Sequence, residues 1–390
     1  MRASGAGATT RRTFQSGSPR LVFALVGFLV LCVAWNALAT RFGESQRAMQ
    51  RRGAVFDLAA RNLRRTLAEL PPPDQPRIVV YGSSQIATVR GESDGGEHTT
   101  SHLLSEDLAK RGLAVEVADF SDGGQQIIET LVIHFATRKT SQPSAVVVGL
   151  NLFSMLRTAV RPTLLEPLDV ASVREAIRSA LPADSDGAAT DELLAWSHRA
   201  AQHVSGRGKT IQQRLDAQIE TWLAEHVPAY ANRQVMFDEL IDAPLRRDAA
   251  TVVMRWLRRQ PGETRTAQSY AIGDAYPISL LALETIARDA RSAGIPMLLV
   301  ALPFDDQRLP VPFDAAIETR VRGDLTAIAQ RNGAALIDLS HELASEHFGN
   351  YKDGSPDNFH YDAAGHAAVA ARIAAALFPR LESSRAGTGR

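Results

Sequence analysis

The sequence predicts an α/β protein of three layers, in which a parallel sheet of about five strands lies between two layers of helices. Short apolar strands alternate with amphipathic helices in two parts of the chain, 77–149 and 277–377. The run AVVVG at 145–149 is apolar throughout, which is typical of a strand that is covered on both faces. A chain of 390 residues is also long enough to bury a large core.

Five strands and four helices can be placed from these patterns. The expected strands are 77–81, 114–120, 145–149, 297–302 and 334–339. The expected helices are 126–137, 277–293, 315–330 and 363–377. Crossovers between parallel strands are right-handed and carry helices to both faces, so this order implies a covered sheet.

One uncharged apolar run, at 21–39, has the length of a membrane span. At about 1.5 Å per helical residue it nearly matches a hydrocarbon core of about 30 Å. Four arginines precede it, namely Arg2, Arg11, Arg12 and Arg20. They predict that residues 1–20 stay in the cytoplasm. A twin-arginine export signal, and cleavage of the run as a signal peptide after Ala39, are alternatives to a retained anchor.

The expected layout therefore begins with a membrane anchor. Its parts are a cytoplasmic tail (1–20), a transmembrane anchor or uncleaved signal (21–39), a helical stalk (40–73), the main domain (74–381) with a helical insertion (155–271), and a disordered tail (382–390). The stalk is predicted because Phe56, Ala59 and Leu63 recur at spacings of three and four. We expect a single-pass protein of the bacterial inner or plasma membrane, with its main domain in the periplasm.

Charge and cysteine content exclude several functions. The 43 Lys and Arg residues balance the 43 Asp and Glu residues, so no basic face for nucleic acid is expected. The single cysteine, Cys32, lies in the apolar run, which excludes cysteine-based metal sites elsewhere. His98 and His102 have the spacing of metal ligands but lack a third. A second candidate cluster is Asp353, Asp357, His360 and His366. We expect neither metal nor cofactor.

Four segments place reactive groups where a parallel sheet forms its sites, beyond the carboxyl ends of its strands. They are Gly82-Ser83-Ser84 after the first strand, Gly123-Gly124 after the second, Asn151 after the third, and Asp357 with His360 in an expected loop before the last helix. Activating a hydroxyl requires an imidazole base and a carboxylate that orients it. Each segment alone also fits a helix cap, a turn or a surface pair. Their combination favours a serine-dependent enzyme.

This combination resembles the SGNH, or GDSL-type, hydrolase family, and the resemblance implies a flavodoxin-like sheet. It assigns Ser84 as the nucleophile, His360 as the base and Asp357 as the residue that orients the imidazole. It assigns the oxyanion hole to Gly124 and Asn151. The similarity covers roughly Arg77–Asn151 and Pro277–Pro379 and leaves out the insertion.

The Gly-Ser-Ser turn and the expected anchor are more similar to the membrane-tethered acyl-transfer members, which include the D-alanyl-lipoteichoic acid transfer protein and alginate O-acetyltransferase relatives. The resemblance implies a serine esterase or O-acyltransferase for small acyl esters or O-acylated envelope glycans, with a membrane acyltransferase as partner. Ser83 stays the second candidate nucleophile.

Two alternatives from other classes stay open. One is a non-catalytic partner in a glycan-modification or envelope-assembly complex that kept the fold. The other is a membrane-tethered scaffold built on the insertion at 155–271, which we otherwise expect to lie over the strand ends as a lid or acceptor platform.

Overall fold

The computed structural model describes residues 26–28, 30–37, 50–52, 54–58, 70–90, 97–156, 160, 164, 168, 170–182, 190–196, 272–273, 275–305, 307, 315–350 and 356–388. The chain divides into two units, one of Ala48–Gly208 with Arg259–Arg390 and one of Met1–Arg47 with Lys209–Arg258. The sheet and the candidate site belong to the first unit. In the second unit, the structure describes a helix over 26–28 and 30–37.

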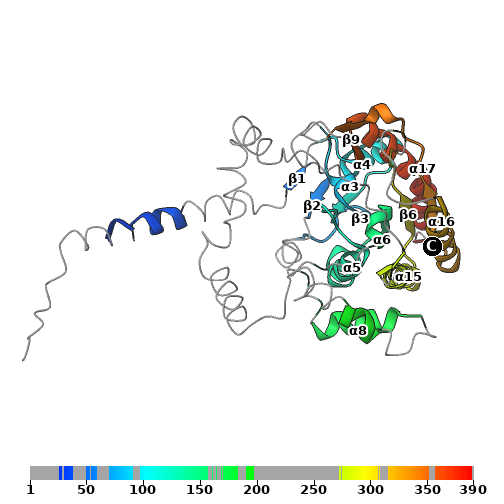
Figure 1. The fold of residues 1–390 in the computed structure, drawn as a ribbon, viewed down its shortest axis with the longest axis horizontal. Coiled ribbons are helices and arrows are strands. Elements are labelled where there is room, and N and C mark those ends of the chain that lie inside the picture. The colour runs from blue at the N-terminus through cyan, green and yellow to red at the C-terminus, as the bar shows by residue number, and fades with distance from the viewer. Residues whose placement is uncertain are drawn as a thin grey trace, which may run out of the picture. The chain divides into compact units, whose positions relative to one another are not determined.

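A seven-stranded sheet forms the centre of the first unit (Figure 1). Its strands, in spatial order, are β1 (Gln50–Arg52), β2 (Val55–Asp57), β4 (Glu116–Asp119), β3 (Arg77–Tyr81), β5 (Ala145–Leu150), β6 (Met297–Ala301) and β7 (Ala335–Asp338). All neighbours run parallel except β1 and β2. The five predicted strands are confirmed as β3 to β7. Their order is that of a flavodoxin-like sheet, with the reversal between β3 and β5.

Helices cover both faces of the sheet, which confirms the expected three layers. One layer consists of α4 (Thr100–Lys110) and α17 (Ala363–Thr388), and the other of α5 (Ile127–Ser141), α15 (Ala275–Ser292) and α16 (Ala315–Asn332). Successive strand residues point to opposite faces. Ile78 and Val80 of β3 therefore pack toward the first layer, and Val79 and Tyr81 toward the second.

The segment that carries Asp357 and His360 was expected to be a loop, and the structure corrects this. β9 (Pro356–Tyr361) pairs antiparallel with β8 (Phe348–Asn350) in a second, two-stranded sheet. Phe348 lies opposite Tyr361, both are buried, and their ring centroids are 6.0 Å apart. This aromatic pair stabilises the extended conformation of the segment.

The helical stalk expected over 40–73 is wrong where the structure describes that range. β1 and β2 lie there instead and extend the sheet beyond β4. Phe56 suggested a helix face by its spacing, but it pairs with Ala118 of β4 and is buried. Val55, the preceding residue, is buried on the opposite face, and aromatic and β-branched side chains fit a strand that is covered in this way. Residues 59–69 lie outside the described part.

The C-terminal tail expected at 382–390 and the insertion expected at 155–271 lie only partly within the described residues. The tail predicted to be disordered from 382 is wrong as far as Thr388, because α17 continues to that residue. Within the insertion expected over 155–271, the described elements are helical: the end of α6 (Leu152–Leu156), α8 (Ala171–Ala180) and a helix over 190–196. Residues 197–271, the remainder of the insertion that we expected to form a lid or acceptor platform, lie outside the described part.

The membrane helix expected over 21–39 is not found in the part of the chain that the structure describes. No helix there is both long enough and apolar enough to cross a bilayer. Positions 21–25, 29 and 38–39 of that run lie outside the described residues.

Candidate active site

The site begins at the end of β3, where the chain turns into the short helix α3 (Ser84–Ala87). Ser83 caps this helix, and its Oγ accepts the backbone N–H of Gln85 at 3.4 Å. Gly82 makes the turn possible, because a Cβ at that position would lie 2.6 Å from Cγ1 of Ile86. Carbon atoms do not pack that closely, so the turn requires glycine for its lack of a side chain.

Ser84, His360 and Asp357 meet in the structure, although Ser84 and His360 are 276 positions apart in the chain. Nε2 of His360 lies 2.8 Å from Oγ of Ser84. Nδ1 of His360 lies 2.9 Å from Oδ2 of Asp357 and 3.1 Å from Oδ1. A carboxylate only accepts hydrogen bonds, so Nδ1 carries the proton and Nε2 is left to accept the hydroxyl of Ser84.

Asp357 is fully buried, and its surroundings keep it ionised. Burial alone would raise the pKa of this carboxyl. The hydrogen bonds from the His360 ring, and from the backbone N–H groups of Phe359 and His360 at 3.1 Å each, outweigh burial and hold the pKa of Asp357 below its ordinary value. The carboxylate can therefore stabilise a positive charge on His360.

Arg90 also contacts Asp357, and the sequence patterns did not reveal it. Its guanidinium Nη1 forms an ion pair with Oδ2 of Asp357, from a position 267 residues earlier in the chain. Arg90 belongs to the turn after α3 and to no motif. Neither periodicity nor spacing connects residues so distant in sequence.

Gly124 and Asn151 lie on the two loops that border the Gly82–Ser84 turn, since β4 and β5 flank β3 in the sheet. The loop after β4 is tied to the turn, because the N–H of Asp122 donates to the carbonyl of Gly82 at 3.3 Å. Gly124 follows in this loop with a φ of 70°. Asn151 directly follows β5 and is half-buried. Their donation to an oxyanion stays a prediction.

The loop after β6 contacts both segments that form the site, the one with Ser84 and the one with Asp357 and His360. Gln85, next to Ser84, is buried and donates from Nε2 to the carbonyl of Pro303 at 2.7 Å. Two residues further, the N–H of Asp305 donates to the carbonyl of Asn358 in β9 at 2.9 Å. This loop therefore connects the turn that carries Ser84 to the strand that carries Asp357 and His360.

His366, a member of one candidate metal cluster, has a structural role. Its Nδ1 accepts the backbone N–H of Thr100 at 3.1 Å, so its Nε2–H donates to the carbonyl of Thr88 at 3.1 Å. Burial lowers the pKa of His366 to about 4, so the ring is neutral near pH 7. Of the same cluster, Asp353 lies outside the described residues.

The other candidate pair shows no third ligand in the described part of the chain. His102 lies 3.4 Å from Glu106 one helical turn away on α4. Among the described residues, no group of three or more histidine, cysteine or acidic side chains is arranged to hold a metal ion.

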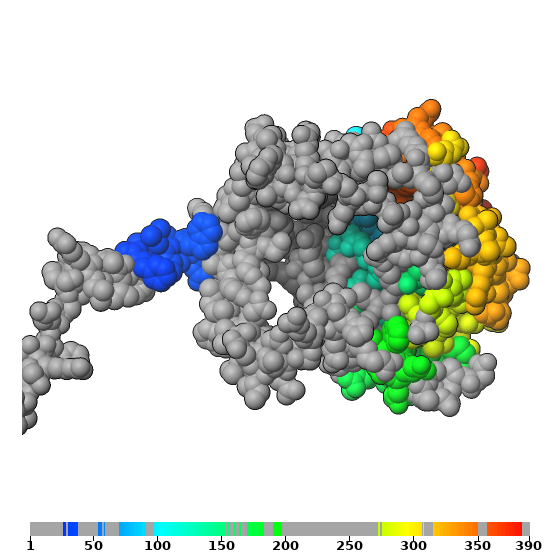
Figure 2. All heavy atoms as spheres, viewed as in Figure 1, coloured from blue at the N-terminus to red at the C-terminus, as the bar shows by residue number. Residues whose placement is uncertain are grey.

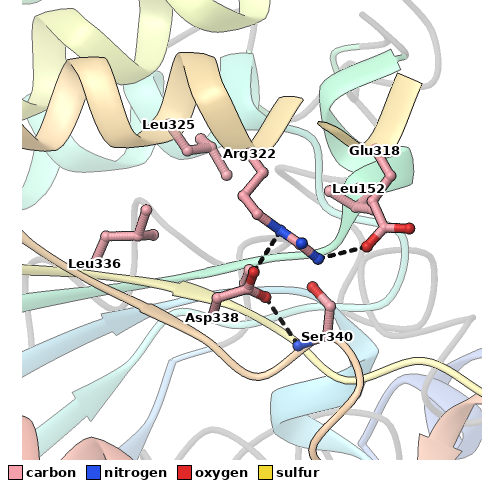
Figure 3. Close-up of a pocket in the computed structure, with 8 residues that line it drawn as sticks. Leu152, Glu318, Arg322, Leu325, Leu336, Asp338 and Ser340 are labelled. Atoms are coloured by element: carbon pink, nitrogen blue, oxygen red, sulfur yellow. Dashed lines mark hydrogen bonds and ion pairs between the residues drawn. The ribbon is translucent and has the colours of Figure 1, made fainter. Parts of the chain in front are cut away.

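A small pocket lies at the carboxyl ends of β6 and β7 (Figure 3). It is lined by Leu152, Ala301, Glu318, Arg322, Leu325, Leu336, Asp338 and Ser340. Arg322 extends from α16 between the two acids, 2.6 Å from Glu318 and 2.5 Å from Asp338. Both carboxylates of this pocket are thus paired with the same guanidinium.

No family model and no curated protein matches the sequence. Several solved structures are similar in fold. One is a lipase/acylhydrolase from Enterococcus faecalis, with 12% identity, a TM-score of 0.38, and coverage of 78% of this chain and 96% of that one. Another is a GDSL-like lipase from Bacteroides thetaiotaomicron, with 8% identity, a TM-score of 0.34, and coverage of 83% and 99%.

A third is a mutant of an acetyl-xylooligosaccharide esterase from Geobacillus, with 10% identity, a TM-score of 0.34, and coverage of 78% and 93%. Similarities with such low TM-scores say nothing about the activity of this chain. The functional conclusion therefore depends on the geometry of its own site.

Proposed function

We propose that this chain is a serine-dependent ester hydrolase of the SGNH type. The supporting observation is the position of His360, with Nε2 at 2.8 Å from the Ser84 hydroxyl and Nδ1 on the buried Asp357 carboxylate. A parallel sheet whose order reverses beside the nucleophile strand is the setting in which such sites form.

The reaction follows from these positions. Nε2 of His360 takes the Ser84 proton as Oγ forms a bond to the ester carbonyl carbon, and the carbonyl electron pair moves to its oxygen. When the tetrahedral intermediate collapses, the C–O bond to the alcohol breaks and His360 returns the proton to the departing oxygen. Water, deprotonated by the same nitrogen, then attacks the acyl carbon; the bond from that carbon to Oγ of Ser84 breaks, the acid leaves and His360 returns the proton to Oγ. Asp357 stabilises the imidazolium in both halves.

The oxyanion needs hydrogen-bond donors opposite the attacking serine. The donors that we propose are the backbone N–H groups of Ser84 and Gly124 and the side-chain amide of Asn151. This assignment is supported by the position of these residues after three neighbouring strands, β3, β4 and β5. Such donors matter because they face charge that develops only in the transition state.

We further propose that the enzyme acts on O-acyl esters of envelope glycans in the periplasm, with hydrolysis or transfer to a sugar hydroxyl as the second step.

We also propose that the enzyme is tethered to a membrane. The observation that supports tethering concerns the helix over 26–28 and 30–37 (blue in Figure 2). Its large apolar side chains are about half to two-thirds exposed: Val26, Phe28, Val30, Leu31, Val33 and Trp35. Exposed apolar surface of this kind favours contact with lipid.

Labelling with a fluorophosphonate tests the hydrolase proposal. The probe reacts with serines that are activated by a base, and peptide mass mapping locates the adduct. We expect the adduct on Ser84 in the wild type and none in His360→Ala. A wild type that resists labelling would contradict the proposal and favour the non-catalytic partner.

Product analysis separates hydrolysis from transfer. The purified protein is given p-nitrophenyl acetate with and without a chitooligosaccharide. Acetylated sugar would support transfer, whereas free acetate alone in both reactions would assign the chain to the hydrolases.

A further inference from the structure

The carboxylate of Asp357 has a second charged partner that the proposed reaction does not use. The guanidinium of Arg90 pairs with its Oδ2, and the Arg90 side chain is 19% exposed while that of Asp357 is 0% exposed. We propose that Arg90 is a positioning residue of the triad, which fixes the Asp357 carboxylate toward His360 and places a permanent positive charge beside it. This inference rests on the proposed function for its meaning in catalysis.

Arg90 is held in place by both strands of the small sheet. Its backbone N–H donates to the carbonyl of Tyr361 in β9 at 3.0 Å. Its side chain passes over Gly349 in β8, where a Cβ would lie 2.5 Å from Cδ of Arg90 and closer still to Nε. Any larger residue at Gly349 would displace the arginine. The contact with Asp357 is therefore supported from two directions, unlike a mobile surface ion pair.

The Arg90 guanidinium adds a second positive charge beside the Asp357 carboxylate. When a triad carboxylate has no other cation, its negative charge acts on the imidazolium alone. Here the same carboxylate also faces the permanent positive charge of the Arg90 guanidinium. Its negative charge is therefore shared between Arg90 and His360, and removal of Arg90 would leave it to act on His360 alone.

Arg90 also helps to orient the Asp357 carboxylate. Oδ1 of Asp357 is fixed by the N–H groups of Phe359 and His360, and Arg90 fixes Oδ2. With both oxygens held, the carboxylate cannot rotate away from Nδ1 of His360.

Other titratable groups on the described elements around β9 are His366, Asp362, His347 and Asp305. His366 is neutral above about pH 4, since burial lowers its pKa. Nδ1 of His347 lies 3.2 Å from Oδ1 of Asp362, and Oδ1 of Asp305 accepts the hydroxyl of Ser345 at 2.8 Å. These groups are engaged with partners outside the triad, whereas Arg90 touches the triad carboxylate itself.

The pH dependence of kcat/KM tests the inference, with p-nitrophenyl acetate and the full chain. In Arg90→Gln we expect the acid limb to move up by about one pH unit and kcat to fall by about tenfold or more. Arg90→Lys keeps the charge without the planar fork, so its acid limb should stay near that of the wild type while kcat falls.

A matched control is Arg111→Gln, which removes an exposed arginine that pairs with Asp107 at 3.6 Å on α4. Both the acid limb and kcat should be unchanged in it. Gly349→Ala displaces Arg90 without deleting it, and it should move the acid limb in the same direction as Arg90→Gln. An acid limb that stays in place in Arg90→Gln and Gly349→Ala would overturn the inference, since a merely structural role predicts that result.

A double-mutant cycle gives a readout that needs no activity. Urea unfolding of the full chain is compared for Arg90→Gln, Asp357→Asn and the double variant. We expect the double variant to differ from the product of the single effects on the unfolding equilibrium constant by about tenfold. Additive effects would overturn the pairing. A wild type that is inactive but shows this coupling would overturn the proposed function and leave the pairing intact.

Discussion

Ser83 and Ser84 are neighbours in the chain but have different surroundings. The Ser83 hydroxyl is buried and accepts a hydrogen bond from the helix that it caps, whereas the Ser84 hydroxyl lies within hydrogen-bond distance of Nε2 of His360. The family pattern favours Ser84, and the geometry supports the same choice. Arg90 could not be anticipated in this way, because its contact depends on two strands that the sequence patterns did not reveal.

The first prediction concerns Asn151. Asn151→Ala removes the proposed side-chain donor and should lower kcat by about 100- to 1000-fold. A matched control is Ser154→Ala, which loses the 2.6 Å hydrogen bond to the carbonyl of Asn151 but keeps the amide. Steady-state kinetics on p-nitrophenyl acetate compare the two. Equal losses in both variants would indicate that Asn151 only shapes the start of α6.

The second prediction concerns pH and His366. The ordinary pKa of 6.5 falls to about 4 in the folded protein because the ring is buried. Between these values the unfolded chain binds more protons than the folded one, so stability is lost as the pH falls from above 6.5 toward 4. The loss amounts to roughly 3 kcal/mol.

His366→Asn keeps an acceptor near Thr100 but does not titrate. Urea unfolding at several pH values should show a flatter dependence over this range for the variant than for the wild type. Parallel curves would contradict the assignment of this pH dependence to His366. The depressed pKa of Asp357 contributes only at lower pH, below the ordinary carboxyl value of 3.8.

At the scale of elements, the five buried strands were predictable because each is a short apolar run beside an amphipathic helix. β3 matches its predicted bounds of 77–81. The strands β1, β2 and β8 have three residues each, which is too short for a periodic pattern. They exist because a partner strand satisfies their backbone groups, and local sequence does not specify that partner.

The turn from β3 into α3 gives the third prediction. Gly82→Ala forces a Cβ against Ile86, so we expect a loss of about 1–3 kcal/mol in the free energy of unfolding and a displaced Ser84 with greatly reduced activity. Gly323→Ala on α16 is the control, since its added Cβ meets no atom within 4 Å apart from its chain neighbours and the backbone of its own helix. Urea unfolding and esterase rates are measured for both. An active, stable Gly82→Ala protein would show that the turn tolerates a side chain.

At the scale of the whole molecule, the order of the strands brings the site together. Ser84 follows β3 at the point where the strand order reverses. His360 lies on β9, 276 positions later in the chain. The loop after β6 connects the two, because it accepts a hydrogen bond from Gln85 and donates one to Asn358 of β9. The sequence predicted Ser84, Gly124 and Asn151 from their positions after strands, and Asp357 and His360 from their spacing before the last helix. It could not predict the path of β9, because that path depends on pairing with β8 and on the hydrogen bond from the N–H of Asp305 to the carbonyl of Asn358.

The N-terminal helix gives the fourth prediction. The full chain should float with phospholipid vesicles in a density gradient, and Ala48–Arg390, which keeps β1, should not. The physical reason is the exposed apolar surface of residues 26–37. Both proteins should hydrolyse p-nitrophenyl acetate alike. A full chain that stays at the bottom of the gradient would contradict membrane tethering.

Whether Ser84 is the nucleophile is tested most directly by the rate of p-nitrophenyl acetate hydrolysis by Ser84→Ala, Ser83→Ala and His360→Ala proteins, each checked for folding by circular dichroism. We expect Ser84→Ala and His360→Ala to lose activity by about 10⁴-fold or more, and Ser83→Ala to stay within about tenfold of the wild type. An active Ser84→Ala protein would show that the hydroxyl lying 2.8 Å from His360 is not the nucleophile.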